Sequence, residues 1–369
     1  MNILHIFKTY YPESYGGVEQ VINTICESTS VDFEYRVITL TKKDQRVEKI
    51  NGYDVYFYPL TFEFSSNGLS WPFLKHYAKH VEWADVIHFH YPWPFADLCH
   101  LIKQFPNKKQ VVTYHSDIVK QKYSKLLYKP LEQRFLNNLD CIVATSDNYV
   151  ESSPNLQRFK EKVEVIPIGI EELSTPLFCK KFDQVTQQKY FLFVGVLRYY
   201  KGLESLVKAL VDTDIHMIIA GDGPEKNKLI ELSQKLNVAH QIQFIGSVSE
   251  QEKAFLLQHA YGFVFPSHVR SEAFGISLLE ASSYSLPLIS CEIGTGTSFV
   301  NIDQQTGYVI EPDHPQQLQQ AMQKLWDNSP LAKRLGQQAY QRFQSLFTSK
   351  IMVEQYQRLY KKLLCGNSE

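Results

Sequence analysis

Short apolar runs alternate with helix-like periods along the whole chain. Seven runs rich in β-branched and aromatic residues stand in the first half: "NILHIF", "YRVITL", "YDVYFY", "DVIHFH", "QVVTYH", "CIVATS" and "VEVIPI". Stretches such as "VEQVINTICES" and "YSKLLYKPLEQRFLNN" lie between several of them and carry apolar residues at helical spacing. The second half repeats the theme with "YFLFVGV", "IHMIIAG", "IQFIG", "GFVF" and "LPLIS". This alternation predicts βαβ units, and therefore parallel sheets covered by helices on both faces.

The length of 369 residues exceeds what one hydrophobic core usually supports, so two domains are expected. The periodicity is lost between residues 170 and 189, where the chain is polar and contains a proline. We therefore predict an α/β fold of two doubly wound, Rossmann-like domains facing across a cleft. The N-terminal domain spans residues 1–170, the linker 171–189 and the C-terminal domain 190–346. Residues 347–369 are expected to form a C-terminal helix that can cross back to the first domain.

Composition narrows the class of protein. Hydrophobic residues make up 44% and charged residues 21% of the chain, and no run of about 18 apolar residues could span a bilayer. The first residues do not have the pattern of a signal peptide. The six cysteines are scattered without a Cys-x-x-Cys pair, which favours reduced thiols and a cytoplasmic location. The net charge of −1 gives no indication of a nucleic-acid partner.

One segment is strongly basic in this nearly neutral chain. Between Leu101 and Phe135, eight basic side chains stand against Asp117 and Glu132, with tyrosines and leucines between them. The basic residues are Lys103, Lys108, Lys109, Lys120, Lys122, Lys125, Lys129 and Arg134. An ordinary solvated helix and a surface that contacts anionic lipid headgroups fit this pattern about equally well.

Ligands of open parallel sheets bind beyond the carboxyl ends of the strands, so residues that directly follow strands are the candidates for a site. Gly16 and Gly17 follow the first strand and precede a helix, where the backbone can approach a phosphate closely. The motif is not a dinucleotide fingerprint, and a plain tight turn is the alternative. His115 ends the run "QVVTYH" and could bind a hydroxyl group or move a proton, but the chain holds 12 histidines and most must be inert.

Two cations open the second domain. In "FLFVGVLRYYKGLES", Arg198 and Lys201 stand three positions apart, just before Gly202 and a helix. Cations are disfavoured at the positive end of a helix, so two of them there indicate an anionic ligand such as a diphosphate.

The segment "SEAFGISLLEAS" holds two glutamates eight positions apart, Glu272 and Glu280. Spacing alone favours a solvated helix face, since glutamate pairs at this distance are common in a chain with 39 acidic residues. If a helix begins near Phe274, however, Glu272 lies in the loop above it and Glu280 about two turns in. The amides of Phe274, Gly275 and Ile276 could then hold a phosphate or hydroxyl groups, and Glu280 could accept two ribose hydroxyls.

The order and spacing of these elements resemble the retaining GT-B glycosyltransferases of family four, which use sugar nucleotides. The resemblance covers nearly the whole chain. It rests on the Gly-Gly loop, "TYHSD", "VIPIGI", "VGVLRYYKG", "AGDGP", "FIGSVSE", "FPSHVRSEAFGISLLEA" and a glycine-rich loop after "PLIS". It implies an enzyme that transfers a sugar with retention of its anomeric configuration.

The resemblance implies roles for the second-domain residues. In that family two glutamates separated by seven residues contact the donor sugar and the ribose, and Glu272 and Glu280 match them. Arg198 and Lys201 match the cations that neutralise the diphosphate.

First-domain residues are matched in the same way. His115 matches a histidine near the reacting carbon, and Gly16 and Gly17 match a glycine loop beside the phosphates. Many relatives have an aspartate directly after that histidine, whereas this chain has Ser116 and then Asp117. The role of Asp117 therefore stays open.

Donor, acceptor and cofactors follow from the same resemblance. The loop "ISCEIGTGTSFVN" is similar to the corresponding loop of bacterial mannosyltransferases that build O-antigen or capsule chains from GDP-mannose. We expect GDP-mannose as the donor, a lipid-linked glycan as the acceptor, and peripheral contact with the inner face of the membrane. Family members transfer without a bound metal, so we expect no metal and no cofactor. Glu272 and His115 would then orient and stabilise the reacting centre without forming a covalent intermediate.

Three alternatives remain at this stage. One is a glycosyltransferase that uses UDP-sugars, and another is a sugar-nucleotide epimerase or hydrolase on the same fold. The third is a non-catalytic partner in an assembly complex. The presence of Arg198, Lys201, Glu272 and Glu280 together disfavours the third, because a decayed site would have no reason to keep all four.

Overall fold

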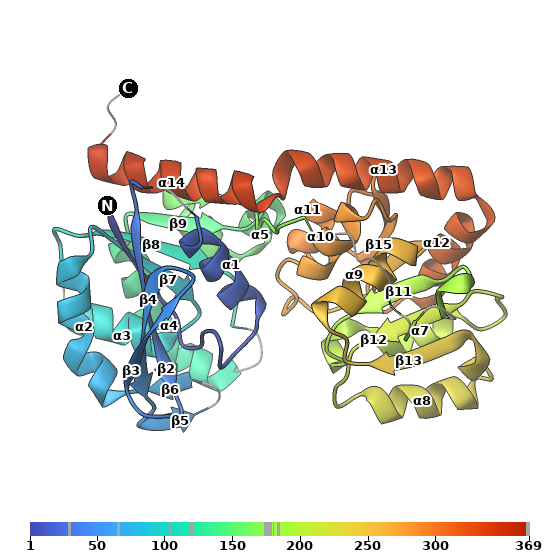
Figure 1. Cartoon of the computed structure of the whole chain (residues 1–369), viewed down its shortest axis with the longest axis horizontal. Coiled ribbons are helices and arrows are strands. Elements are labelled where there is room, and N and C mark those ends of the chain that lie inside the picture. Colours follow the sequence, from blue (N-terminus) through green and yellow to red (C-terminus); the bar gives the residue numbers. More distant parts are fainter. Residues whose placement is uncertain are drawn as a thin grey trace. The chain divides into compact units, whose positions relative to one another are not determined.

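A computed structural model describes residues 1–28, 31–64, 67–103, 105–118, 122–172, 179, 181–182 and 185–366, with the backbone alone at residues 122–127 and 185. The chain forms two compact units, one of Met1–Gly169 together with Ser349–Glu369 and one of Ile170–Thr348 (Figure 1). The C-terminal helix therefore belongs to the same unit as the N-terminus, and residues 171–189 are grouped with the second unit.

An eight-stranded sheet forms the centre of the N-terminal unit. Its strands run in the order β10-β9-β8-β7-β1-β2-β4-β3, and all neighbours are parallel except the β3–β4 pair. A separate hairpin is made by β5 and β6. The strands are β1 (Asn2–Ile6), β2 (Glu34–Thr41), β3 (Arg46–Ile50), β4 (Tyr53–Pro59), β5 (Phe62–Phe64), β6 (Asn67–Leu69), β7 (Val86–Tyr91), β8 (Lys109–Tyr114), β9 (Cys141–Ala144) and β10 (Val163–Val165).

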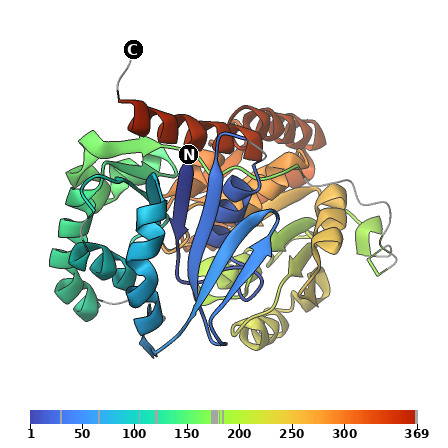
Figure 2. The same cartoon turned by 60° about the vertical axis from the view of Figure 1, so that its left-hand side comes forward.

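Helices cover both faces of this sheet, as Figure 2 shows with the N-terminal unit turned forward. One face packs on α2, α3 and α4, whose apolar side chains join those of the strands in a single core. The other face carries α1 and α14, which contact each other. The helices are α1 (Gly17–Cys26), α2 (Trp71–Trp83), α3 (Pro94–Ile102), α4 (Lys122–Asn138), α5 (Asp147–Ser152), α6 (Pro154–Arg158), η1 (Lys160–Lys162) and α14 (Ser349–Cys365).

The C-terminal unit is built on a six-stranded, fully parallel sheet of order β13-β12-β11-β14-β15-β16. Its strands are β11 (Phe191–Val194), β12 (Met217–Ala220), β13 (Ile242–Gly246), β14 (Gly262–Phe265), β15 (Leu288–Cys291) and β16 (Gly307–Ile310). Its helices are η2 (Val185–Gln187), η3 (Tyr199–Lys201), α7 (Leu203–Ala209), α8 (Lys226–Lys235), η4 (Ala239–Gln241), α9 (Glu250–His259), α10 (Ile276–Ser283), α11 (Gly296–Val300), α12 (Pro315–Asp327) and α13 (Ser329–Leu346).

Each sheet has one switch point, at which the order of its strands changes direction. The strand order changes direction between β1 and β7 in the first unit and between β11 and β14 in the second. At such a switch point the two loops that follow the flanking strands run to opposite sides of the sheet and leave room for a ligand. The predicted α/β fold with two Rossmann-like sheets is thus confirmed, and each apolar run named above overlaps a strand.

The sequence prediction missed strands at the sheet edges. The edge strand β3 alternates half-buried and exposed positions, so it lacks a continuous apolar run. The hairpin strand β5 is fully exposed, and the edge strand β16 is only half-buried at its two central positions. The helical C-terminal tail is also divided, because α13 ends at Leu346 and α14 begins at Ser349.

Buried polar contacts attach α14 to the N-terminal sheet. The Tyr360 hydroxyl lies 2.6 Å from His88 Nδ1, and the Tyr356 hydroxyl lies 2.9 Å from Thr113 Oγ1. His88 Nε2 in turn lies 2.7 Å from Thr113 Oγ1. Both ring nitrogens of this fully buried histidine are therefore satisfied, which a polar group in a core requires.

Several histidines are buried in the N-terminal unit. Burial lowers the pKa of each, because the charged ring would lose its hydration. The histidines are His5, His80, His88, His90, His100 and His115, and the pKa falls to about 3 for His5, His80 and His115. Asp97 is buried in the same unit, and burial raises its pKa to about 8.

We predict that mild acid, between pH 7 and pH 5, destabilises the N-terminal unit. Between pH 3 and the unfolded-state histidine pKa near 6.5, the unfolded chain binds protons that the folded chain excludes, so the free energy of unfolding falls as the pH falls. Each such histidine contributes up to about 2 kcal/mol between pH 7 and pH 5. Asp97 has the opposite effect on the free energy of unfolding, because its raised pKa makes the folded chain bind a proton more readily than the unfolded chain. It is one group, however, and the buried histidines are six. Urea unfolding at both pH values measures the change.

Two variants control this measurement. His80→Gln should make the stability less dependent on pH, because it removes one ring that the folded chain keeps neutral. His240→Gln makes the same substitution at an exposed histidine of the second unit and controls for the substitution itself. A free energy of unfolding that is unchanged or larger at pH 5 would contradict the prediction.

Candidate functional site

The charged candidates of the second unit meet at the switch point of its sheet. The loop after β11 carries Arg198 and Lys201, and the loop after β14 carries Glu272. Gly202 lets the two loops approach, since a Cβ there would lie 1.9 Å from the Pro266 carbonyl oxygen, and its φ of 66° also favours glycine. The strand order thus brings together residues about 70 positions apart.

Lys201 and Glu272 form an ion pair across these loops. Lys201 Nζ donates to Glu272 Oε2, and both side chains are largely buried. The Ser267 hydroxyl donates to the same oxygen over 3.3 Å. The carboxylate expected to contact a sugar and the lysine expected to contact a diphosphate are therefore each other's partners, which the sequence did not predict. Arg198, by contrast, is exposed at the start of η3.

Glu280 has a partner of its own. Lys253 on α9 donates to Glu280 Oε1 over 2.7 Å and also lies 2.7 Å from Glu250. Burial raises the pKa of Glu280, and the positive charge of Lys253 opposes this shift. Burial would lower the pKa of Lys253, but the two glutamates outweigh it and the pKa is raised. Lys253 therefore stays charged and holds one oxygen of a nearly buried carboxylate.

The helix after Glu272 begins later than expected. Gly275 has a φ of 89°, so α10 begins at Ile276, and Glu280 lies about one turn into the helix, not two. Phe274 precedes the helix and is buried. The expectation of a helix from Phe274 with Glu280 two turns in was therefore wrong, because the left-handed residue at position 275 interrupts the helical backbone.

The loop after β15 supports this segment. Thr295 Oγ1 donates to the Glu272 carbonyl oxygen over 2.8 Å, and the Gly296 amide donates to the Ala273 carbonyl oxygen over 2.9 Å. A Cβ at Gly296 would lie 2.4 Å from the Phe274 ring, so a side chain there would displace it. The glycine-rich loop "EIGTGTSF" thus fixes the backbone that presents Glu272.

Gly16 and Gly17 lie where the sequence placed them. Gly16 is the N-cap residue of α1, and Gly17 is its first residue. The nearest side chain is Glu19, which is buried and accepts a hydrogen bond of 2.7 Å from Ser14. Burial lowers the pKa of nearby Lys8, while Glu19 opposes that shift. This loop therefore already contains a carboxylate beside its glycines.

His115 directly follows β8 and keeps 7% of its surface exposed. Its Nε2 lies 3.0 Å from His90 Nδ1, and burial lowers its pKa to about 3, so the ring is neutral near pH 7. Asp117 accepts hydrogen bonds of 2.9 Å from the Tyr114 and Ser153 hydroxyls. These bonds hold the Asp117 side chain in place within the first unit.

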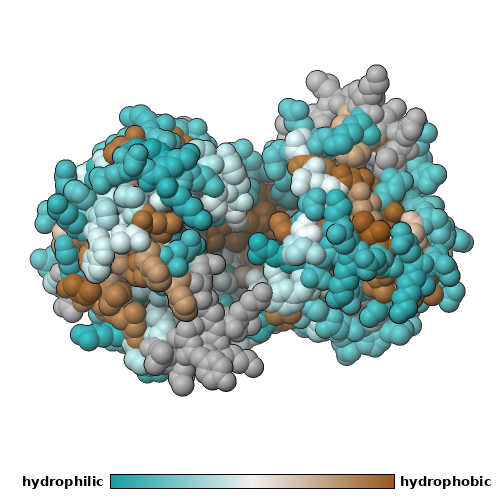
Figure 3. Space-filling view, turned by 90° about the horizontal axis from the view of Figure 1, so that it is seen from below, coloured by the Kyte–Doolittle hydropathy of each residue, from teal (hydrophilic) through white to brown (hydrophobic). Residues whose placement is uncertain are grey.

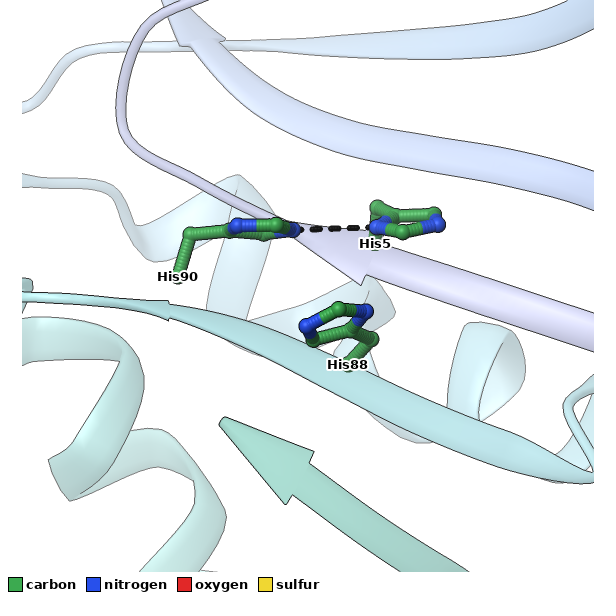
Figure 4. Close-up of side chains that lie close together, drawn as sticks. All are labelled: His5, His88 and His90. Atoms are coloured by element: carbon green, nitrogen blue, oxygen red, sulfur yellow. Dashed lines mark hydrogen bonds between the residues drawn. The ribbon is translucent and has the colours of Figure 1, made fainter. Parts of the chain in front are cut away.

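A group of histidines that the sequence spacing did not predict lies on β1 and β7. Ring nitrogens of His5, His88 and His90 all lie within 4.8 Å of one another (Figure 4). They come from strands that are neighbours in the sheet but more than 80 residues apart in the chain. The one Asp-x-Asp triplet, Asp212-Thr213-Asp214, precedes β12 and so lies at the amino-terminal edge of its sheet.

The predicted site residues are thus divided between the two units. Gly16, Gly17 and His115 belong to the first unit, at or next to its switch point. The remaining candidates, Arg198, Lys201, Glu272, Phe274, Gly275, Ile276 and Glu280, belong to the second. In the second unit, the paired lysines and carboxylates with adjoining helix-terminal amides can bind a ligand that carries both anionic and hydroxyl groups.

Two family descriptions match this chain. Residues 15–172 match "Glycosyltransferase Family 4", and residues 176–342 match "Glycosyl transferases group 1". The chain is 40% identical over 374 residues to the O-antigen chain mannosyltransferase C of Escherichia coli, with all of both chains covered. It is 42% identical over 355 residues to the D-rhamnosyltransferase WbpZ of Pseudomonas aeruginosa, covering 95% of this chain and 93% of that protein.

Solved structures share the fold. The sucrose-phosphate synthase of Thermosynechococcus elongatus superposes with a TM-score of 0.80 at 22% identity, covering 99% of this chain and 100% of that one. Anabaena HepE in complex with UDP superposes with a TM-score of 0.78 at 15% identity, covering 98% and 100%. Together with the full-length relatives, these matches establish that the chain belongs to the GT-B glycosyltransferases of group 1 and family 4.

Proposed function

We propose that this glycosyltransferase moves mannose from GDP-mannose to a lipid-linked glycan during synthesis of a cell-surface polysaccharide such as O-antigen. We further propose that it retains the anomeric configuration and needs no metal ion. The full-length relative from Escherichia coli, an O-antigen chain mannosyltransferase, supports the sugar and the setting. A sugar nucleotide offers a diphosphate, ribose hydroxyls and sugar hydroxyls, which are the groups that the second unit can recognise.

The observation that carries this proposal is the pair of lysine–glutamate contacts at the carboxyl edge of the second sheet. Lys201 holds Glu272, and Lys253 holds Glu280, so each carboxylate is positioned before a ligand arrives. A diphosphate that binds Lys201 and Arg198 would free an oxygen of Glu272 for sugar hydroxyls. Lys253 binds Oε1 of Glu280, and no described residue donates to Oε2, which would then accept from a ribose.

Charge development explains how these residues would assist the reaction. As the bond between sugar and phosphate breaks, negative charge grows on the diphosphate and positive charge on the anomeric carbon. Lys201, Arg198 and helix-terminal amides would stabilise the first, and Glu272 the second. The departing phosphate would take the proton of the acceptor hydroxyl on the same face of the sugar. His115 is neutral, so it would orient hydroxyl groups and would not supply charge.

A second candidate donor has its own support. The relative from Pseudomonas aeruginosa is a D-rhamnosyltransferase, and its sequence identity with this chain is 42% over 355 residues, against 40% over 374 residues for the mannosyltransferase. D-Rhamnose is mannose without the hydroxyl at carbon 6, so the two sugars share every other hydroxyl. A site built around the hydroxyls common to both would accept either sugar, and discrimination would depend on what surrounds carbon 6.

We also propose that the N-terminal unit contacts an anionic membrane. No helix in the described ranges combines the length and apolar character needed to cross a bilayer. Phe62 and Phe64 on β5 and Trp71 at the start of α2 are 59%, 63% and 69% exposed, and the Trp71 amide donates to Thr61 beside the hairpin. Figure 3 shows brown, apolar side chains gathered on the N-terminal unit in the view from below. Exposed aromatic side chains of this kind suit a membrane interface.

Some basic residues of the segment Leu101–Phe135 are engaged in contacts within the unit, and others are exposed. Lys103 and Lys108 donate to backbone carbonyls, and Lys109 pairs with Asp140, so these three are engaged within the unit. Lys129 and Arg134 are exposed on α4. Lys120 and the side chains of Lys122 and Lys125 lie outside the described residues. The electrostatic part of the proposal therefore rests on residues of α4.

Donor binding is the first prediction from this proposal. GDP and GDP-mannose should raise the melting temperature without added metal. At a ligand concentration of 100 times the dissociation constant, the free energy of unfolding should increase by about 2.7 kcal/mol. Glu280→Ala and Arg198→Ala should abolish the rise, and Glu272→Ala should lower transfer by about 100-fold. The measurement is the melting temperature in the presence of each nucleotide and its sugar conjugate: GDP, UDP, ADP and dTDP, alone and joined to mannose, rhamnose or glucose. The series is repeated in the presence of a metal chelator.

The outcomes separate the alternatives. A response to UDP-sugars alone would overturn the mannose assignment but leave a glycosyltransferase. Conversion or cleavage of the donor with no acceptor present would indicate an epimerase or hydrolase. Activity that a chelator abolishes and a divalent metal restores would contradict metal independence, and full transfer by Glu272→Ala would contradict the site.

Lys253 generates a second prediction. Lys253→Met would leave the Glu280 carboxylate buried and unpaired, so its pKa should rise further and it should protonate. We expect about 3 kcal/mol of lost stability and at least a tenfold weaker affinity for the nucleoside diphosphate. Isothermal titration calorimetry and urea unfolding report the two effects separately.

A double variant and an exposed lysine serve as controls. Lys253→Met with Glu280→Gln removes the unpaired charge and should restore stability, while affinity stays low because the carboxylate is absent. Lys228→Met breaks exposed ion pairs with Glu204 and Glu225 and should change both quantities little. Unchanged affinity in Lys253→Met would show that this lysine does not position Glu280 for a ligand.

Membrane contact is tested by flotation of the full chain with vesicles. Recovery should be higher with anionic phosphatidylglycerol vesicles than with neutral phosphatidylcholine vesicles and should fall in high salt. Phe64→Ser with Trp71→Ser should reduce recovery several-fold, whereas Val47→Ser, an exposed apolar side chain on β3, should not. Equal recovery from neutral and anionic vesicles would reject the electrostatic contribution.

A further inference from the structure

Three imidazole rings form a hydrogen-bonded chain inside the N-terminal unit. His5 Nδ1 lies 3.0 Å from His90 Nε2, and His90 Nδ1 lies 3.0 Å from His115 Nε2. Figure 4 shows the first contact as a dashed line between rings that point toward each other. His5 and His90 are fully buried, whereas His115, at the end of the chain, retains some exposure. We call these three residues the histidine chain.

The parallel sheet produces this alignment. His5 lies beside His88 in the pairing of β1 with β7, and His88 and His90 share one face of β7. Thr113 on β8 lies beside His90, and the ladder continues past β8 because the His115 amide donates to the Tyr91 carbonyl. His115 therefore follows Thr113 on the same face. This is the face that α14 covers.

A metal site is the obvious alternative for these histidines, and the ring geometry disfavours it. A metal needs one bare nitrogen from each ring, all directed at a single point. His88 has both nitrogens engaged, by Thr113 and Tyr360, and its ring stacks on that of His90 with centroids 4.4 Å apart and planes 24° apart. Lone pairs lie in the ring planes, so those of stacked rings do not converge. His90 has both nitrogens engaged as well.

The chain restricts where protons can lie. A neutral imidazole has one N–H, and each contact between two nitrogens needs exactly one proton, so only two arrangements preserve both hydrogen bonds. In the first, His5 donates to His90, His90 donates to His115 Nε2, and His115 carries its own proton on Nδ1. In the second, His115 Nε2 donates to His90 Nδ1, His90 Nε2 donates to His5 Nδ1, and His115 Nδ1 carries no proton.

His5 decides between the two arrangements. Its Nε2 is buried and has no hydrogen-bond partner in the part of the chain that the structure describes. The second arrangement would place an N–H on that nitrogen and leave a buried donor unsatisfied. The first leaves a lone pair there, and buried acceptors without partners are tolerated more often than buried donors.

We propose that His5 and His90 are positioning residues that hold His115 as the tautomer with its proton on Nδ1. The exposed end of the histidine chain is then a hydrogen-bond donor, suited to a hydroxyl or phosphate oxygen of a ligand, and not a general base. The assignment of the tautomer is independent of the reaction, whereas its consequence for sugar transfer rests on the proposed function.

The direct test is a nitrogen–proton correlation spectrum of the full chain labelled with ¹⁵N in its histidine rings. The His115 signals are identified by their loss in His115→Gln. We expect the wild-type spectrum to show His115 with a protonated Nδ1 and a bare Nε2, opposite to the tautomer that free histidine prefers. A protonated Nε2 on His115 in the wild type would overturn the proposal without any further variant.

Variants test the cause of that tautomer. His90→Met and His5→Met each replace a ring that donates by a thioether, which accepts weakly and cannot donate. The sulfur at position 90 would accept from His115 Nε2, and the sulfur at position 5 would accept from His90 Nε2, so both variants should shift His115 toward the Nε2-protonated form. His88→Met is the matched control, because His88 lies in the same group of rings but outside the histidine chain, and His115 should keep its tautomer. No shift in either chain variant would overturn the proposal, as would one equivalent of bound zinc with metal-shifted His90 signals.

Activity separates this inference from the proposed function. His90→Met and His5→Met should lower kcat for transfer at least tenfold while leaving the Kd for the nucleoside diphosphate unchanged. A chain that shows the expected tautomer but transfers no sugar from any donor would refute the proposed function alone. A chain that transfers mannose with His115 protonated on Nε2 would refute the tautomer assignment alone.

Discussion

The ion pair between Lys201 and Glu272 is the interaction on which the candidate site depends. It joins the loops after β11 and β14, which are adjacent only because the sheet changes direction between these strands. Gly202 allows the loops to touch, and Thr295 and Gly296 fix the backbone of Glu272. A buried ion pair contributes little net stability, because desolvation offsets most of the attraction. Its effect here is geometric, since it fixes the positions of two candidate donor-binding side chains relative to each other.

The buried ionisable groups discussed above are kept neutral or paired in both units, although by different means. In the second unit, lysines hold carboxylates, and Lys253 keeps its charge between Glu280 and Glu250. In the first unit, burial lowers the histidine pKa values so far that the rings stay uncharged. An isolated buried charge would cost several kcal/mol, so each solution removes a penalty that the core could not tolerate.

The sequence predicted local features well and contacts between distant segments poorly. Apolar runs located the buried strands, and the rule that ligands bind after strands located His115, Arg198, Lys201 and Glu272. The partners of these residues depend on strand order, which apolar periodicity does not encode. His5 meets His90 because β1 lies beside β7, and Lys253 meets Glu280 because α9 and α10 flank neighbouring strands. The start of α10 was missed for a local reason, since a single left-handed glycine delays the helix.

The pairing of Lys201 with Glu272 has a consequence for ligand selection. A site with unpaired cations would attract any anion, including free phosphate, whereas an anion at Lys201 must compete with Glu272 for the ammonium group. A simple anion would gain part of the lysine's charge but weaken the ion pair that compensates the largely buried Glu272, so its net gain would be small. A ligand with hydroxyl groups beside its diphosphate satisfies both at once. Selectivity for a sugar nucleotide over inorganic phosphate would therefore arise from the energetic coupling of the two side chains, and not from the affinity of either one alone.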